Sequence, residues 1–191
     1  MLEADTIDSV RGLEGEAAKQ YFGIFHQLIL HQQDDFPFRG RNRRPPKDAV
    51  NAMLSFVYTL IANDMTAALE TVGLDPYVGF LHVLRPGRPS LALDMMEELR
   101  AYLGDRLVLS LINRKQVSVT DFMKQGEECV VMNDNCRKTI LSAWQNRKRE
   151  IIQHPYLNQK VNIGLLPYVQ AMMMARFIRK DIDDYPVFFI K

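Results

Sequence analysis

The sequence predicts a mainly α fold, with residues 1–191 forming a single helical domain that contains at most one short β-hairpin. Apolar side chains recur every three or four positions over several long segments, as they do on the buried face of a helix. Breaks rich in Pro, Gly or Asp separate these segments, and only one short stretch suggests a pair of strands. With 47% hydrophobic residues, a chain of this length is long enough to bury one large core.

Two helices are predicted in the N-terminal half of the chain. The first covers residues 13–33, and the segment Asp34–Pro37 ends it. A stretch rich in Arg, Pro and Gly follows without periodicity, so we expect an exposed loop there. The second helix covers residues 48–72, with Asp48 as a capping residue and Gly73 as its stop. Its apolar residues lie on most sides, which predicts a central core helix.

The C-terminal half is predicted to hold further helices and one hairpin. We expect helices from Ser90 with this serine as N-cap, over 103–114, over 136–153 with Asp134 or Asn135 as cap, and over 161–181. Residues 127–132 suggest a strand, with 119–122 as its partner. The apolar tail 183–190 fits two interpretations, docking on this domain or docking on a neighbouring subunit.

Charge and cysteine content bound the class of protein. The net charge is +1, so composition alone does not indicate nucleic-acid binding, yet the segment Arg39–Lys47 holds five of the 24 Lys and Arg residues. This loop suits phosphate contact, and a solvated linker is the alternative. The spacing of Cys129 and Cys136 matches neither a zinc half-site nor a disulfide framework, which fits a reducing cytoplasm. No apolar run approaches the roughly 20 residues that span a bilayer.

Acidic residues near the start of the helix at Ser90 are candidates for metal chemistry. Asp94 and Glu97 are three positions apart, so a helix places them on nearly the same face. Glu98 is rotated by about 100° from Glu97, so we expect it to face solvent. A solvated helix face is the alternative for the pair, but an acid inside an apolar stretch is functional or capping.

His82 and Glu14 are further candidates. His82 follows the apolar run from Val78 and precedes a Pro- and Gly-rich loop, which directs it toward the helix that carries Asp94. The alternative is that His82 is a core or loop residue whose hydrogen bonds are made within the protein, and that it binds no metal. Glu14 lies between Gly12 and Gly15, which permit close backbone approach, although a first-turn helix acid would have the same sequence.

Three segments, in this order and at this separation, carry a family resemblance: Arg11–Gly15, Gly73–His82 and Ser90–Leu99. The residue sequences of two further segments, Asn51–Tyr58 and Asp105–Gln116, strengthen the resemblance. Together they resemble the C-terminal helical domain of the CRISPR-associated integrase, the spacer-acquisition nuclease, and lean toward its subtype I-C branch. The family usually carries an N-terminal β domain ahead of this segment, so we expect the chain to be a fragment that lacks it.

The resemblance implies a metal-dependent DNA endonuclease and integrase that joins the 3′-hydroxyl of a new spacer to the repeat backbone by transesterification. Glu14, His82 and Glu97 match the metal ligands of the family, and Asp94 matches the acid that supports them. The resemblance also implies Asp at many members' equivalent of Glu97, so the extra methylene of this chain either shifts the coordination geometry or places a water between this residue and the metal. Two carboxylates and one imidazole suit Mg²⁺ or Mn²⁺ better than zinc. No His-Glu-x-x-His or phosphate-binding Gly-x-x-x-x-Gly-Lys-Ser/Thr motif points to another class.

The expected partner is DNA, branched or double-stranded, and no membrane is expected. The DNA-binding candidates are basic residues near the predicted ligands or in the basic loop: Arg11, Arg41, Arg43, Arg44, Arg85 and Arg88. The resemblance also implies a homodimer of the full-length protein and a small ferredoxin-like partner protein. The alternative function is a non-catalytic helical DNA-binding or assembly module whose acids are structural.

Overall fold

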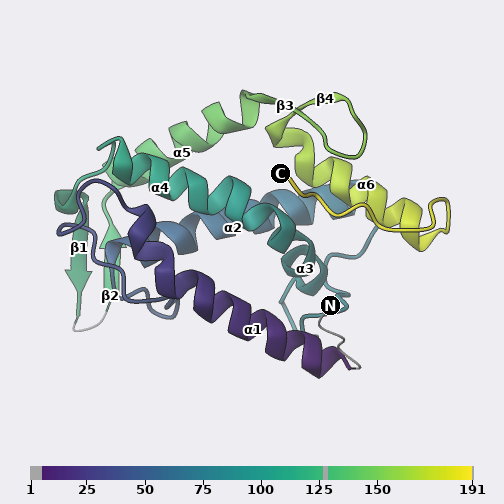
Figure 1. Ribbon diagram of the computed structural model, residues 1–191, viewed down its shortest axis with the longest axis horizontal. Helices are drawn as coiled ribbons and strands as arrows, with labels where there is room; N and C mark the ends of the chain where they lie inside the picture. Colours follow the sequence, from purple (N-terminus) through teal and green to yellow (C-terminus); the bar gives the residue numbers. More distant parts are fainter. Residues whose placement is uncertain (1–5, 127–128, 191) are drawn as a thin grey trace. The chain divides into compact units, whose positions relative to one another are not determined.

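A computed structural model describes residues 6–126 and 129–190 (Figure 1). The chain divides into two compact units: unit 1 is Met1–Phe56 with Leu107–Ile140, and unit 2 is Val57–Arg106 with Leu141–Lys191. The predicted mainly α fold is confirmed, because helices and two two-stranded antiparallel sheets make up the regular structure of the described residues. That residues 1–191 form a single domain stays a prediction.

Unit 1 begins with α1 (Ile7–Ile24), which continues into the 3₁₀ turn η1 (Phe25–Leu28). The helix starts before the predicted residue 13 because the Thr6 side chain accepts a hydrogen bond from the backbone N–H of Ser9 at 3.1 Å. It ends before the predicted residue 33. The side chain of Asn113 accepts from the N–H of Leu30 at 2.8 Å, and this bond draws the chain out of the helical path.

The long helix α2 (Ala49–Thr71) lies within one residue of its predicted bounds, and Asp48 caps it by accepting the N–H of Asn51 at 2.7 Å. Its fully buried apolar side chains recur at helical spacing: Val50, Met53, Leu54, Val57, Ile61, Met65 and Leu69. Contrary to expectation, α2 is long and apolar enough to cross a membrane by length and composition alone. A buried core helix passes the same test, and these side chains show that burial.

The hairpin of unit 1 joins β1 (Phe122–Gln125) to β2 (Cys129–Met132), with Phe122 opposite Met132. The predicted strand at 129–132 is therefore confirmed, while residues 127 and 128 lie outside the described residues. The partner strand predicted at 119–122 was wrong for its first three residues, and only Phe122 belongs to a strand. Val119–Asp121 forms the 3₁₀ turn η3, which a reciprocal capping box between Ser118 and Asp121 stabilises, so pairing starts only at Phe122.

Unit 2 contains α3 (Ser90–Leu99) and the π-helical turn η2 (Arg100–Asp105), which leads into α4 (Arg106–Asn113). The helix predicted over 103–114 therefore begins three residues late as an α-helix. A π-helix has no sequence signature of its own, and the apolar pattern alone did not reveal it.

The remaining elements are α5 (Asp134–Arg149), β3 (Ile151–Gln153), β4 (Lys160–Asn162), η4 (Ile163–Leu165) and α6 (Leu166–Ile178). Asn133, rather than the predicted Asp134 or Asn135, caps α5, because its side chain accepts from the N–H of Cys136 at 2.8 Å. The hairpin of β3 and β4 was not predicted and shortens both neighbouring helices. Strands of three residues are too short to show alternation.

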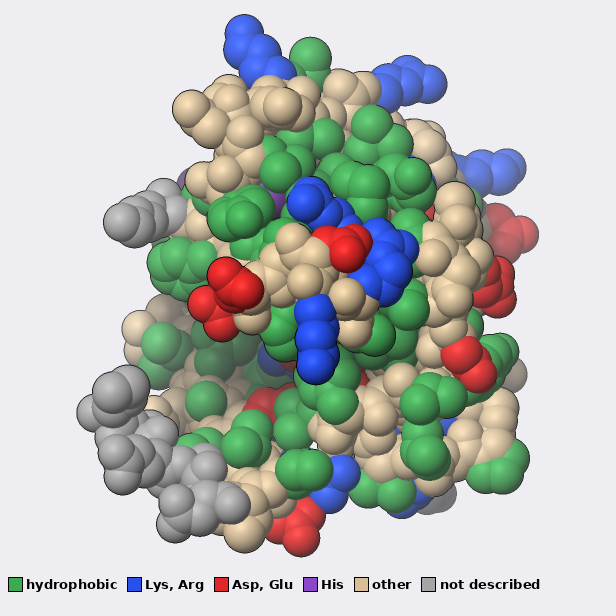
Figure 2. Space-filling view, turned by 90° about the vertical axis from the view of Figure 1, so that its right-hand side faces the viewer, with side chains coloured by type: hydrophobic (Ala, Val, Ile, Leu, Met, Phe, Trp, Pro, Cys, Tyr) green, Lys and Arg blue, Asp and Glu red, His purple; other side chains and the backbone are tan. Residues whose placement is uncertain are grey.

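The C-terminal segment docks on unit 2, which resolves the alternative left open by the sequence. Phe188 is buried, and its N–H donates to the Glu98 carboxylate at 2.6 Å. Val187 and Phe189 on either side remain exposed. Figure 2 looks onto the face where α6 ends and shows hydrophobic side chains there around a group of both basic and acidic side chains.

Candidate metal centre

The loop that carries His82 folds back over the start of α3. The carbonyl oxygen of Pro76 accepts hydrogen bonds from the N–H groups of Leu91 at 2.9 Å and Ala92 at 3.3 Å. The Ser90 hydroxyl donates to the carbonyl of Val83 at 3.3 Å and makes no cap bond to its own helix. The prediction of Ser90 as N-cap was therefore wrong, because the returning loop supplies the acceptor that a cap would provide.

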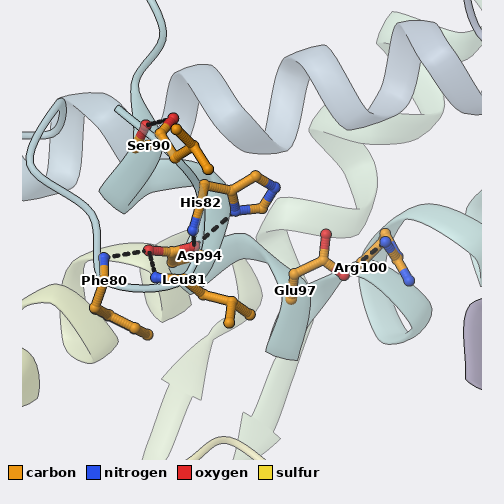
Figure 3. Close-up of polar contacts among 8 residues, drawn as sticks. Phe80, Leu81, His82, Ser90, Asp94, Glu97 and Arg100 are labelled. Carbon is orange, nitrogen blue, oxygen red and sulfur yellow. Dashed lines mark hydrogen bonds and ion pairs between the residues drawn. The ribbon is translucent and has the colours of Figure 1, made fainter. Parts of the chain in front are cut away.

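Asp94 holds this loop in place (Figure 3). Its Oδ2 accepts from the N–H groups of Phe80 at 2.7 Å and Leu81 at 3.0 Å. Its Oδ1 accepts from the N–H of His82 at 2.8 Å and lies 2.6 Å from Nδ1 of the same residue. The Asp94 side chain has no exposed surface. Four donors surround the buried carboxylate, which is the environment expected of an acid that orients its neighbours.

Gly79 makes this close approach possible, and the sequence reasoning did not single it out as a site residue. A Cβ added there would lie 2.6 Å from Oδ2 of Asp94 and 2.7 Å from the carbonyl carbon of Ser90. Both distances are shorter than van der Waals contact, and the second obstacle is backbone. The sequence does contain one signal for Gly79: it lies three residues before His82, in the loop that precedes the helix with Asp94.

His82 is oriented by Asp94 so that one ring nitrogen is committed. With Nδ1–H donating to the carboxylate, Nε2 is the nitrogen with a lone pair for a metal or a proton. The side chain is 19% exposed, so the ring lies at the edge of the unit rather than in its core. A carboxylate that binds one ring nitrogen of an imidazole is an arrangement in which proteins present the other nitrogen of a histidine to a metal ion.

Glu97 lies one turn further along α3, and Figure 3 shows its carboxylate directed at Arg100. Nη1 of Arg100 is 2.6 Å from Oε2 of Glu97, and the two side chains are 23% and 29% exposed. Glu97 is therefore accessible, in contrast to Asp94. Of the two acids on this face, only Glu97 is placed to reach a ligand from solvent.

Glu98 does not face solvent, and that prediction was wrong. Its carboxylate accepts from the hydroxyl of Tyr185, from Nε2 of Gln170 at 3.0 Å and from the N–H of Phe188 at 2.6 Å. Burial raises the pKa of the Glu98 carboxyl above its ordinary value, although these three donors oppose the shift. Burial and the adjacent Glu98 likewise raise the pKa of Tyr185. The C-terminal segment covers a residue that helical periodicity alone leaves outside.

Glu14 belongs to α1 in unit 1 and is half-buried. A Cβ added at Gly12 or Gly15 would meet nothing within 4 Å, so the close approach expected from these glycines is not seen. Over the described residues, the structure contains no group of three or more His, Cys, Asp and Glu side chains gathered to hold a metal. The structure thus brings together His82 and Asp94, with Glu97 one turn away, and the role of Glu14 stays a prediction.

The predicted DNA-binding arginines differ in their surroundings. Arg41 is committed to structure: its guanidinium donates to Oδ1 of the buried Asn51 at 2.7 Å and to Oγ of Ser55 at 3.1 Å. Arg11 pairs with the exposed Asp8 at 2.7 Å. The others lie in loops, where Arg43, Arg44 and Arg85 are exposed and Arg88 is half-buried.

Comparison with known proteins identifies relatives over nearly the whole chain. Residues 1–146 match the family described as CRISPR associated protein Cas1. The chain is 57% identical over 188 residues to the CRISPR-associated endonuclease Cas1 2 of Rhodospirillum rubrum, covering 98% of this chain and 55% of that protein. It is 51% identical over 189 residues to the CRISPR-associated endonuclease Cas1 of Leptospira interrogans, covering 99% of this chain and 74% of that protein. The chain spans about half the length of the Rhodospirillum protein and of a similar one from Chlorobaculum tepidum.

Solved structures share the fold. A Cas1 protein from Thermotoga maritima superimposes with a TM-score of 0.82 at 28% identity, covering 93% of this chain and 54% of that one. A Cas6-RT-Cas1–Cas2 complex contains a chain that matches with a TM-score of 0.84 at 26% identity, over 98% of this chain and 20% of that one. A casposase bound to its integration product shares the fold with a TM-score of 0.86 at 22% identity, over 99% of this chain and 54% of that one.

Proposed function

This chain belongs to the Cas1 family, and on that premise we propose that it acts in a metal-dependent DNA endonuclease and integrase that inserts new spacers into a CRISPR array. It corresponds in this proposal to the C-terminal helical domain, of the subtype I-C branch. The names of the similar proteins from Rhodospirillum and Leptospira, CRISPR-associated endonucleases, support the activity.

The single observation that carries the proposal is the Asp94–His82 pair. The buried carboxylate fixes the loop through three backbone N–H groups and commits Nδ1 of His82. Because the two nitrogens lie on opposite sides of the imidazole ring, this contact leaves Nε2 turned away from the carboxylate. Pre-ordering of this kind lowers the entropy lost when the imidazole binds a ligand.

The donor chemistry fits a hard divalent cation. His82, through Nε2, and Glu97, through its carboxylate, are the residues of unit 2 that would hold Mg²⁺ or Mn²⁺, and Glu14 is the third ligand that the family resemblance implies. When bound, the ion supplies Lewis-acid activation of the attacking hydroxyl and stabilises charge on the attacked phosphate. Asp94 keeps the imidazole in one tautomer throughout. His82 acting instead in proton transfer is the alternative role.

The reaction exchanges one phosphodiester for another. The 3′-hydroxyl oxygen of the incoming strand forms a new bond to phosphorus of the repeat backbone, and the bond from phosphorus to the leaving 3′-oxygen breaks. The proton of the attacking hydroxyl passes to solvent, or to Nε2 of His82 in the alternative role in which this nitrogen does not bind the ion, and the leaving 3′-oxygen takes up a proton from water. Arg85 and Arg88 flank the connection between His82 and α3, where they suit contact with the phosphates.

The proposal also includes partners. DNA, branched or double-stranded, is the substrate, and the full-length protein acts as a homodimer with a small ferredoxin-like partner in the cytoplasm. The match to a Cas1 chain within a complex that also contains Cas2 supports such an assembly. The casposase likeness, at 22% identity, supports the fold alone.

Cleavage of branched and linear DNA in Mn²⁺, Mg²⁺ or EDTA tests the proposal. The wild-type chain is compared with His82→Ala and, as a matched control, with His26→Ala, whose ring is exposed and lies within hydrogen-bond distance of the carbonyl of Gly23. We expect metal-dependent cleavage that His82→Ala abolishes and His26→Ala keeps. Metal-dependent cleavage that His82→Ala retains would show that His82 is not part of the site. DNA binding without cleavage in any metal would favour the non-catalytic binding module instead.

A further inference from the structure

Arg100 lies beside the candidate metal centre and has no role in the function proposed above. It follows α3 directly, and its Nη1 donates to Oε2 of Glu97 at 2.6 Å, as Figure 3 shows. Both side chains are less than one-third exposed, so solvent screens this ion pair less than it screens a pair on an open surface. The contact therefore restricts where the Glu97 carboxylate can lie.

Arg100 is itself held by the ring of Tyr58. Its guanidinium carbon lies 5.7 Å from the ring centroid, within the range of a cation–π contact. The hydroxyl of Tyr58 donates to Oδ1 of Asp105 at 2.5 Å, and Asp105 is only 1% exposed. A Cβ added at Gly104 would lie 3.0 Å from the same ring, so the ring is confined at its tip and along its edge.

The π-helical turn explains why two residues of one segment reach the same tyrosine. In a π-helix the backbone hydrogen bonds join residues five positions apart, which brings such residues to the same side of the turn. Arg100 and Asp105 are separated by this interval, at the two ends of η2. The widened turn therefore places Arg100 over the ring while Asp105 binds its hydroxyl.

Glu97 has a particular need for such an anchor. A Glu carboxylate is joined to its helix through one rotatable bond more than an Asp carboxylate, so its position is less restricted by the helix alone. Each extra rotamer that a metal must freeze lowers the affinity, unless the protein has already restricted the side chain. An ion pair to a confined arginine supplies that restriction.

We propose that Arg100 is a positioning residue that, braced by Tyr58, holds the longer Glu97 side chain in the orientation in which it binds a divalent cation together with His82. This inference rests on the proposed function, because it needs Glu97 to be a metal ligand. Arg100 acts through Glu97 and through no direct contact with the metal.

Calorimetric titration of the folded chain with Mn²⁺ tests the inference. Arg100→Gln is expected to weaken Mn²⁺ binding about tenfold, the effect usual for a residue that orients a metal ligand. The matched control is Arg106→Gln, because Arg106 also stacks on a tyrosine, with its guanidinium carbon 5.4 Å from the Tyr102 ring centroid. It should change the affinity less than twofold. Unchanged or tighter Mn²⁺ binding by Arg100→Gln would overturn the inference, since removing a positive charge by itself favours a cation.

The same titration in a Glu97→Asp background separates positioning from a general structural effect. An aspartate has one rotatable bond fewer and is too short to keep the same contact, so adding Arg100→Gln should then cost less than about twofold. A tenfold loss in both backgrounds would mean that Arg100 supports the fold rather than Glu97, and would overturn the inference. Thermal unfolding of the metal-free variants checks that each is folded.

His82→Ala distinguishes failure of this inference from failure of the proposed function. If wild-type Mn²⁺ binding is lost in His82→Ala but unaffected by Arg100→Gln, only the role of Arg100 is wrong. If the wild type shows no Mn²⁺ binding that His82→Ala removes, the proposed metal site fails and the role of Arg100 fails with it.

Discussion

Asp94 and Glu98 lie four positions apart on α3, and both place a largely buried carboxylate among hydrogen-bond donors. Asp94 accepts from three backbone N–H groups of one loop and from the ring of His82, which reaches the surface. Glu98 accepts from a tyrosine hydroxyl, a glutamine amide and one N–H, all of them neutral donors in the unit's interior. One acid orients a titratable group toward solvent, and the other fastens the C-terminal segment.

The difference teaches that burial of an acid does not by itself mark a functional site. What distinguishes the two carboxylates is the partner through which each can act. The partner of Asp94 is an imidazole with a second nitrogen available for chemistry. The partners of Glu98 are Tyr185, Gln170 and the backbone of Phe188, and Oε1 of Gln170 also lies 3.1 Å from Nε2 of the buried His154. That network ends inside the unit.

Removing the Asp94 carboxylate should have the largest effect on stability. In Asp94→Ala the N–H groups of Phe80, Leu81 and His82 lose their acceptor, at about 1 kcal/mol or more each, so we expect a total loss of about 3 kcal/mol in the free energy of unfolding. Urea unfolding followed by circular dichroism measures it. Asp75→Ala is the control, since that side chain accepts the N–H of Tyr77 in an exposed turn, and this is its one hydrogen bond among the described residues. A loss below about 1 kcal/mol would contradict the role given to Asp94.

Gly79→Ala disturbs the same contact between loop and helix, but through the loop rather than through Asp94. The added methyl group overlaps Oδ2 of Asp94 and the backbone of Ser90, so the loop must move away from α3. We expect a loss of about 2 kcal/mol in unfolding free energy, within the range for overpacking. Gly12→Ala, in an open helical position, should instead stabilise the chain by about 0.5 to 1 kcal/mol. Equal effects of the two substitutions would show that the loop tolerates displacement.

On the Glu98 side, Tyr185→Phe removes one hydrogen bond to the carboxylate and leaves the ring in place. Hydrogen bonds to charged groups contribute about 1.5 to 3 kcal/mol, and we expect the lower value because two other donors remain. Hydrogen exchange at the Phe188 amide should also become faster, as the segment opens more often. Mn²⁺ binding at His82 should be unaffected. A change in Mn²⁺ affinity would show that the Glu98 network and the Asp94–His82 pair are not independent.

The pH dependence of the unfolding free energy gives a smaller but separate test of the buried Glu98 carboxylate. Because the pKa of Glu98 is raised in the folded state above the ordinary 4.5, the folded chain binds a proton more tightly than the unfolded chain. This contribution to stability is fully present below the unfolded pKa and is lost as pH rises through the folded pKa. Glu98→Gln cannot titrate, so its unfolding free energy should fall less than that of the wild type over this pH range. Urea unfolding from pH 4 to pH 8 in both proteins measures the difference, and parallel curves would contradict the raised pKa.

The sequence predicted those parts of the fold that rest on local patterns. Helix α2 was placed within a residue at each end because its apolar residues recur along its whole length and Asp48 and Gly73 mark its ends. The turn η2 and strands β3 and β4 were missed, because such short segments carry too little periodicity. Glu98 was placed in solvent because helical periodicity contains no information about a segment that returns from the far C-terminal end of the chain.

The sequence singled out residues of the candidate site, and their role as metal ligands stays a prediction. The residue types and spacing singled out His82, Asp94 and Glu97, and the family resemblance assigned them to a metal. The supporting contacts depend on a loop that folds back over its own helix, which only the three-dimensional structure reveals. Arg41 shows the converse: it lies in a basic loop, yet its guanidinium is bound to Asn51 and Ser55. Composition alone cannot distinguish this internally bonded arginine from Arg43 and Arg44, which are exposed.

The most direct test of the central claim, that Asp94 orients His82 as a metal ligand, is nitrogen NMR of the ¹⁵N-histidine-labelled chain during Mn²⁺ titration, with His82→Ala to assign the signals. We predict that His82 is protonated at Nδ1, and that low Mn²⁺ broadens its Nε2 signal while the buried His154 is unaffected. A His82 protonated at Nε2, or equal broadening of all the histidines, would contradict the account.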